Sequence, residues 1–177
     1  MKNLLFLSFL ILASCSKKNE YNLSANSDIP DGEMVYLVQY KENVPVLKDS
    51  INVLGGNFSF SDSIVVPEMY YLFFKNIRGN VPVVLEPGNI EMTVYKDSLR
   101  STIIKGTKSN DDFKQYIDES SSFINELNSI QNEINYNIAI NDSLIKLDLE
   151  EQFIEMRKKL TDYEYDFMSN KNDSYVS

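Results

Sequence analysis

The chain has 177 residues, no histidine, no tryptophan and a single cysteine, and its formal net charge is −9 at pH 7. An acidic chain without clustered lysine and arginine would repel phosphates, so we expect no nucleic-acid partner. The lack of histidine and the lone cysteine argue against a zinc or iron site, and we expect no cofactor. A hydrophobic content of 43% is enough for one folded domain with its own core.

The first fourteen residues have the layout of a bacterial lipoprotein signal peptide. Lys2 is followed by an apolar run from Leu4 to Ala13, and small residues stand directly before Cys15. This order predicts cleavage after residue 14 and lipid attachment to Cys15. An ordinary cleaved signal peptide, with the cysteine incidental, is the alternative. The run is too short to cross a membrane, which takes about 20 apolar residues.

Residues 15–20 are expected to form a polar tether behind the lipid. No acidic residue directly follows Cys15, and an aspartate there commonly retains lipoproteins in the inner membrane. We therefore expect the protein to be lipid-anchored in the cell envelope, in the outer membrane and facing the periplasm. The anchor would make the membrane a partner without a spanning helix.

Residues 21–107 are expected to form an antiparallel β-sandwich of about eight strands. Turn signals such as Gly55-Gly56-Asn57 and Pro87-Gly88-Asn89 recur at the spacing typical of all-β domains. Phe58 and Phe60 alternate with serines, which indicates a strand with one face in water. The expected strands are 21–25, 33–40, 44–50, 57–63, 69–76, 81–86, 90–95 and 101–105.

The segment from Met69 to Phe74 is apolar or aromatic at every position. A sandwich strand normally buries one face only, so the second face of this segment needs cover. Packing under the chain's own helices is the favoured interpretation, and contact with a ligand or partner is the other. The candidate residues for such a contact surface are Tyr70, Tyr71, Phe73 and Phe74, in a wider aromatic set with Tyr36 and Tyr40, for which core packing is the competing interpretation.

From residue 108 the hydrophobic period changes to that of a helix. Apolar residues recur at steps of three and four over 113–138 and again over 145–167. Asn110, Asp111 and Asp112 are expected to supply N-terminal capping and favourable negative charge at the start of the first helix, and Asn141-Asp142-Ser143 to separate it from the second. We therefore expect an antiparallel helical hairpin over 108–170 and a tail at 171–177. Because a hairpin alone buries little, its apolar residues are expected to dock on the sheet.

A series of turns in fixed order resembles a known family, the domain of unknown function 4369. That domain is typically found in Gram-negative lipoproteins, ahead of a thioredoxin-like domain related to peroxiredoxins. The resemblance covers roughly residues 20–115, and the helices resemble the usual connector. It rests on Asp31-Gly32, Asp49-Ser50, the stretch from Gly55 to Phe60, Leu85-Glu86-Pro87-Gly88, and Gly106-Thr107 with Asn110-Asp111.

The redox chemistry of that family cannot be transferred to these residues. Thiol–disulfide exchange needs a thiolate that attacks a disulfide, and the family's Cys-x-x-C motif lies in a domain that would follow Ser177. The resemblance therefore implies an accessory domain. Its thioredoxin-like domain would be lost, truncated or supplied by another polypeptide, and another envelope protein is the alternative partner.

Carboxylates are the remaining candidates for catalysis, as in glycoside hydrolases. The candidates are Glu86, Asp62, Asp49 and Glu68. With 26 acidic residues in the chain, chance pairs are expected, and Glu86 before Pro87-Gly88 suits a turn at a strand end. Five Asp-Ser pairs (49–50, 62–63, 97–98, 142–143 and 173–174) are likewise expected to bond to backbone at turns rather than to bind calcium.

We therefore expect a non-catalytic, membrane-anchored module with an accessory or scaffolding role, and not an enzyme. The first alternative is a periplasmic protein that binds a glycan or a peptide through the sandwich face. The second is a hydrolase that uses paired carboxylates.

Overall fold

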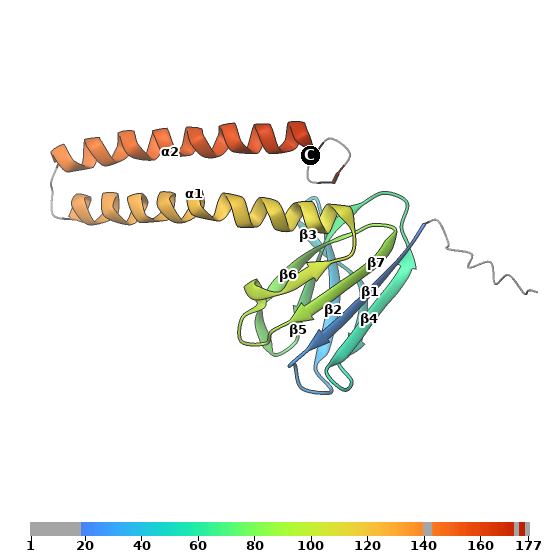
Figure 1. Cartoon of the computed structure of the whole chain (residues 1–177). Helices are drawn as coiled ribbons and strands as arrows, with labels where there is room; N and C mark the ends of the chain where they lie inside the picture. The colour runs from blue at the N-terminus through green and yellow to red at the C-terminus, as the bar shows by residue number, and fades with distance from the viewer. Residues whose placement is uncertain (1–18, 140–142, 172–173, 176–177) are drawn as a thin grey trace, which may run out of the picture.

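The computed structural model describes residues 19–139, 143–171 and 174–175. Eight strands in two packed sheets come first, and two long helices follow (Figure 1). The expected β-sandwich with a C-terminal helical hairpin is therefore confirmed. Cys15, the proposed signal peptide and residues 141–142 between the helices lie outside the described residues.

Each sheet contains four strands. The first sheet has the order β4-β1-β7-β8 and the second the order β3-β2-β5-β6. The strands of the first are β1 (Glu20–Ser27), β4 (Asn57–Ser63), β7 (Gly88–Val94) and β8 (Ile103–Lys105). Those of the second are β2 (Met34–Lys41), β3 (Val44–Asn52), β5 (Glu68–Phe74) and β6 (Ile77–Leu85).

One strand pair departs from the antiparallel expectation. β1 and β7 are parallel, with Leu23 beside Ile90, while the other described pairs are antiparallel. All four strands of the second sheet lie between β1 and β7 in the chain. This long connection allows β7 to run in the same direction as β1. Side-chain alternation is the same in both kinds of pair, so the sequence pattern could not reveal the difference.

The core lies between the two sheets and takes alternate residues from nearly every strand. Leu23 of β1, Leu37 of β2, Leu72 of β5 and Ile90 of β7 are at most 1% exposed. Their neighbours along each strand point to the outside, as the alternation predicts. This burial of apolar surface is the main stabilising contribution to the sandwich.

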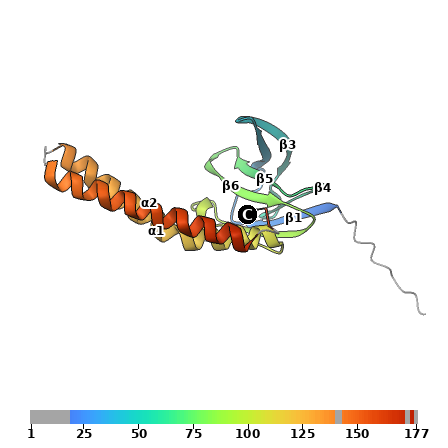
Figure 2. The ribbon, with the colours of Figure 1, turned by 90° about the horizontal axis from the view of Figure 1, so that it is seen from above.

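The hairpin consists of α1 (Lys108–Ala139) and α2 (Ser143–Asn170), which run antiparallel and project beyond the sandwich (Figures 1 and 2). At 1.5 Å per residue α1 is about 48 Å long, so only its first turns can reach the sandwich. These turns meet the edge strands β6 and β8. The expectation that the hairpin docks on the sheet is therefore corrected to docking at its edges.

The two helices are joined to each other by a separate apolar cluster. Ile130 and Ile134 of α1 pack with Leu149 of α2, and Phe153 and Met156 extend the contact. Nearer the sandwich the contact is aromatic, and its rings belong to Tyr116, Phe123, Tyr163 and Phe167. In the parts of the chain that the structure describes, neither helix is apolar enough over a sufficient length to cross a membrane.

Candidate functional site

The four aromatic residues proposed as a contact surface lie on two different faces of β5. Tyr70 and Phe74 point into the core and are 5% and 4% exposed. Tyr71 and Phe73 point to the opposite side of the sheet and are half-buried. The structure therefore brings only Tyr71 and Phe73 to a surface, because successive strand residues alternate between faces.

Neighbouring strands extend this surface. Tyr36 of β2 lies opposite Phe73, and Val38 lies opposite Tyr71. The rings of Tyr40 and Tyr71 meet edge to face, with centroids 5.3 Å apart. Alternation places Met34 and Met69 on the same side. We call this surface the outer aromatic face; it consists of Met34, Tyr36, Val38, Tyr40, Met69, Tyr71 and Phe73.

The helices do not supply the cover that the sequence led us to expect for this face. α1 meets the sandwich at β6 and β8, and Figure 2 shows the hairpin leaving to one side of the sheets. Tyr40 is 46% exposed, and the other six residues are half-buried. A continuous apolar surface of this kind is a common mark of a binding face, and tyrosine rings suit contacts that are partly wet.

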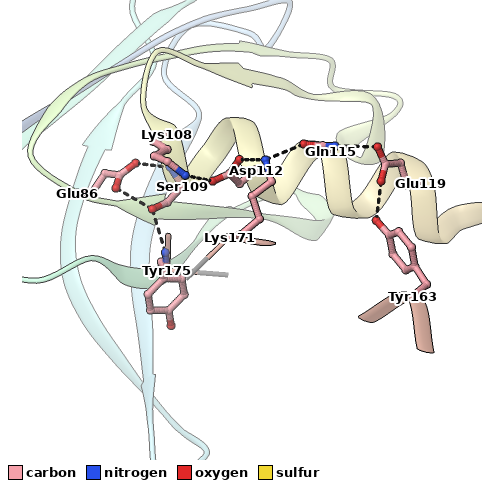
Figure 3. A network of polar contacts seen from close by, with 9 residues as sticks. All are labelled: Glu86, Lys108, Ser109, Asp112, Gln115, Glu119, Tyr163, Lys171 and Tyr175. Carbon is pink, nitrogen blue, oxygen red and sulfur yellow. Dashed lines mark hydrogen bonds and ion pairs between the residues drawn. The ribbon is translucent and has the colours of Figure 1, made fainter. Parts of the chain in front are cut away.

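A second feature is the polar junction between the sandwich and the hairpin (Figure 3). Glu86, directly after β6, accepts hydrogen bonds from the backbone N–H and the hydroxyl of Ser109, both at 2.7 Å. The carboxylate thus satisfies a free N–H in the first turn of α1, where negative charge is favourable. The Ser109 hydroxyl also accepts a hydrogen bond from the backbone N–H of Tyr175, at 3.3 Å.

Asn110 binds the edge of β6 instead of capping its own helix. Its Oδ1 accepts the N–H of Val84 at 3.0 Å, and its Nδ2 donates to the Val84 carbonyl at 2.7 Å. The side-chain amide therefore takes the place of the next strand at this edge. Because Asn110 is 1% exposed, these backbone groups would otherwise be buried without partners. The expected capping role of Asn110 is wrong, and Glu86 takes that role.

Lys171, directly after α2, connects the end of the hairpin to the first turns of α1. Its ammonium group bonds to Asp112 at 2.6 Å and to Gln115 Oε1 at 3.0 Å, while Lys108 reaches the second oxygen of Asp112 at 2.7 Å. Burial acts to raise the pKa of Asp112, but the hydrogen bonds from Lys108 and Lys171 outweigh it and hold the pKa at about 2. Asp112 is therefore an ion-pair partner and not the cap that we expected.

Two tyrosine–carboxylate hydrogen bonds continue the connection between the helices. Tyr163 of α2 donates to Glu119 of α1 at 2.9 Å, and Tyr116 of α1 donates to Glu164 of α2 at 2.9 Å. Burial, and next the bond to Glu119, raise the pKa of Tyr163 to about 12. Both phenols therefore remain protonated donors at neutral pH.

The four candidate catalytic carboxylates all have structural partners. Glu86 is bound to Ser109, as described above. Asp62 forms an ion pair with Lys48 at 2.7 Å, and Glu68 accepts a hydrogen bond from Gln39 at 2.8 Å. Asp49 and Asp62 each accept the N–H of the next serine at 2.7 Å. These two Asp-Ser pairs lie in the edge strands β3 and β4 and not in turns.

An edge strand of each sheet, a short 3₁₀ helix and α1 also enclose a groove of about 470 Å³. Its lining comes from β6, the 3₁₀ helix η1 (Leu99–Ser101), β8 and α1. Apolar side chains such as Leu99, Ile104 and Phe113 dominate, and Arg100 is also in the lining. The volume is in the range of small-molecule pockets, and sequence reasoning missed it because the lining residues come from four separate elements.

Replacing Asp112 by Asn is expected to lower the free energy of unfolding at pH 7 by about 2 kcal/mol, because a charge-assisted bond to Lys171 is lost. A carboxyl whose pKa is depressed in the fold stabilises the protein above its unfolded pKa and loses that effect as the pH falls toward the folded pKa. The difference between wild type and Asp112→Asn should therefore be complete above about pH 5 and shrink between roughly pH 4 and 2.

Urea denaturation at stepped pH measures this difference. Asp118→Asn is the matched control, because the Asp118 side chain is 59% exposed in its ion pair with Lys114 and should contribute little. An equal difference at pH 3 and pH 7 would contradict the assigned role of Asp112.

Residues 21–113, just over half of the chain, match the family model described as domain of unknown function (DUF4369). No curated protein matches the chain. The match covers all eight strands except the first residue of β1, and it ends within the first turns of α1, so it includes Glu86 and Asn110. The chain belongs to the DUF4369 family.

Proposed function

We propose that the protein is a non-catalytic, lipid-anchored module of the cell envelope with an accessory or scaffolding role. Its role would be related to that of the N-terminal part of thioredoxin-family lipoproteins. The observation that carries the proposal is the polar junction. Glu86 and Asn110 join the sandwich to the start of the hairpin, and Lys171 joins the end of the hairpin to its start. The hairpin is then a stiff arm that sets the distance between the anchored sandwich and a partner.

The partners of the carboxylates support a non-catalytic role. A general acid or nucleophile must be free to exchange a proton or to reach a substrate. Glu86 and Asp62 are instead engaged by backbone donors and a lysine, and Glu68 by Gln39 and by Tyr70 at 3.3 Å. Their contacts are those of structural residues.

The anchoring part of the proposal rests on the sequence before Cys15. Labelled palmitate should be incorporated into the native protein and not into Cys15→Ala, because the cysteine thiol is the acceptor of the lipid. Ser16→Ala is the matched control and should label as the native protein does. Equal labelling of the native protein and Cys15→Ala would refute the anchor.

The scaffolding part predicts a fixed angle between sandwich and hairpin. In a Cys15→Ala background, dyes are attached at Val65→Cys in the β4–β5 connection and at Tyr136→Cys near the hairpin tip, both at exposed positions. Single-molecule energy transfer should give one narrow population. Adding Glu86→Ala and Asn110→Ala should broaden it, because both side-chain connections to β6 are then lost.

Glu155→Ala removes an exposed ion pair with Lys159 within α2 and should leave the distribution unchanged. A broad distribution in the protein with an intact junction would contradict a scaffolding role.

The outer aromatic face supports a second candidate function, which is binding of a glycan or an extended peptide. A thioredoxin-like domain or another envelope protein could use the same face. Any ligand found on a glycan array or in a peptide library should lose at least about tenfold in affinity to Tyr71→Ser, since aromatic contacts dominate such surfaces. Val65→Ser, at a position that is 79% exposed and off this face, is the control. No hit in either library would count against this candidate.

A further inference from the structure

The side of α2 that points away from α1 carries a regular row of exposed residues. Four of its apolar members are more than 60% exposed: Leu144 (81%), Leu147 (62%), Ile154 (70%) and Tyr165 (69%). Met168 is 44% exposed. We call this row the α2 outer stripe; its members are Leu144, Leu147, Glu151, Ile154, Lys158, Thr161, Tyr165 and Met168.

The spacing of the stripe is that of a coiled-coil seam. Its members follow one another at alternating steps of three and four residues along the whole of α2, which keeps them on one side of a helix. The opposite side of α2 is already used, since Leu149, Leu160 and Phe167 are buried. α2 is therefore apolar on two opposite sides, whereas a helix at the surface of a monomer needs only one.

We propose that a second copy of this chain covers the stripe, with the two α2 helices packed antiparallel. Packed about the middle of the stripe, which runs from Leu144 to Met168, the helices share a midpoint at Met156. In this register Leu144 lies level with Met168 of the second copy, and Leu147 with Tyr165. Both ends of the stripe are then covered by apolar side chains, in a contact about 40 Å long.

The charges at the middle of the stripe fit the same register. Glu155, beside the stripe, lies level with Arg157 of the second copy, and the reciprocal pair is formed by symmetry. Glu155 also forms an ion pair with Lys159 of its own helix, at 2.9 Å. Acidic and basic side chains therefore alternate across the two-fold axis. Glu151 of the stripe lies level with the neutral Thr161 of the second copy.

The position of the sandwich permits this arrangement. It lies at the C-terminal end of α2, and the tip of the hairpin is far from it (Figures 1 and 2). Antiparallel packing therefore places the two sandwiches at opposite ends, where they do not collide. Parallel packing would bring both sandwiches, in a chain of net charge −9, to the same end.

Sedimentation of the full chain tests the interface. The wild-type chain should be a dimer at micromolar concentration, and Leu147→Glu should raise the dissociation constant at least about tenfold, because a carboxylate replaces an apolar group that lies level with Tyr165 of the second copy. Tyr136→Glu is the matched control, since Tyr136 is a 66% exposed residue of α1 outside the stripe. A monomeric wild type, or a dimer that Leu147→Glu leaves intact, would overturn the proposal.

Disulfide trapping tests the orientation in a Cys15→Ala background. An equal mixture of Leu147→Cys and Tyr165→Cys should form the mixed disulfide, because these positions are level in the antiparallel register. Leu147→Cys alone should not cross-link, since the two copies of residue 147 would lie ~28 Å apart and a disulfide needs Cα atoms within about 7 Å. Cross-linking of Leu147→Cys with itself would indicate parallel packing and overturn the register.

Discussion

The structure depends on how the last strand of the second sheet is connected to the first helix. β6 ends at Leu85, and both residues beside Leu85 bind α1. The backbone of Val84 bonds to the side chain of Asn110, and the side chain of Glu86 bonds to Ser109. A sheet edge and a helix N-terminus both carry unpaired backbone groups. Here Asn110 of the helix bonds to the backbone at the sheet edge, and Glu86 after the strand bonds to the backbone at the helix N-terminus. The direction of the hairpin follows from these two contacts.

The two open sides of the sandwich are treated differently. On the side of β6 and β8, the first turns of α1 cover the edges. On the side of β3 and β4, both edge strands are exposed, and an ion pair between Lys48 and Asp62 links them. Asp49 and Asp62 also bind backbone N–H groups of their own strands. Charged side chains and occupied donors discourage another strand from pairing at these edges. The outer aromatic face and the α2 outer stripe are apolar surfaces away from these edges.

These two apolar surfaces differ in their exposure and in the kind of partner that each suits. The outer aromatic face lies on the sheet, is half-buried and suits a ligand or partner of different chemistry. The α2 outer stripe is long, strongly exposed and complementary to itself when reversed, which suits a second copy. Because the stripe lies on the projecting hairpin and the face on the sandwich, a dimer formed through α2 need not cover the aromatic face.

The sequence by itself determined the strands, the helices and the change between them near residue 107, because hydrophobic period and turn residues are local properties. It also identified β5 as unusual, since every residue of that strand from Met69 to Phe74 is apolar or aromatic. Only the tertiary structure decided that Tyr71 and Phe73 face outward while Tyr70 and Phe74 lie in the core. Three further features could not be read from the sequence either. They are the parallel pairing of β1 with β7, the capping of α1 by Glu86 and the bonding of Asn110 to a strand edge. Each joins residues more than twenty positions apart, and local pattern carries no information about which distant backbone groups will meet.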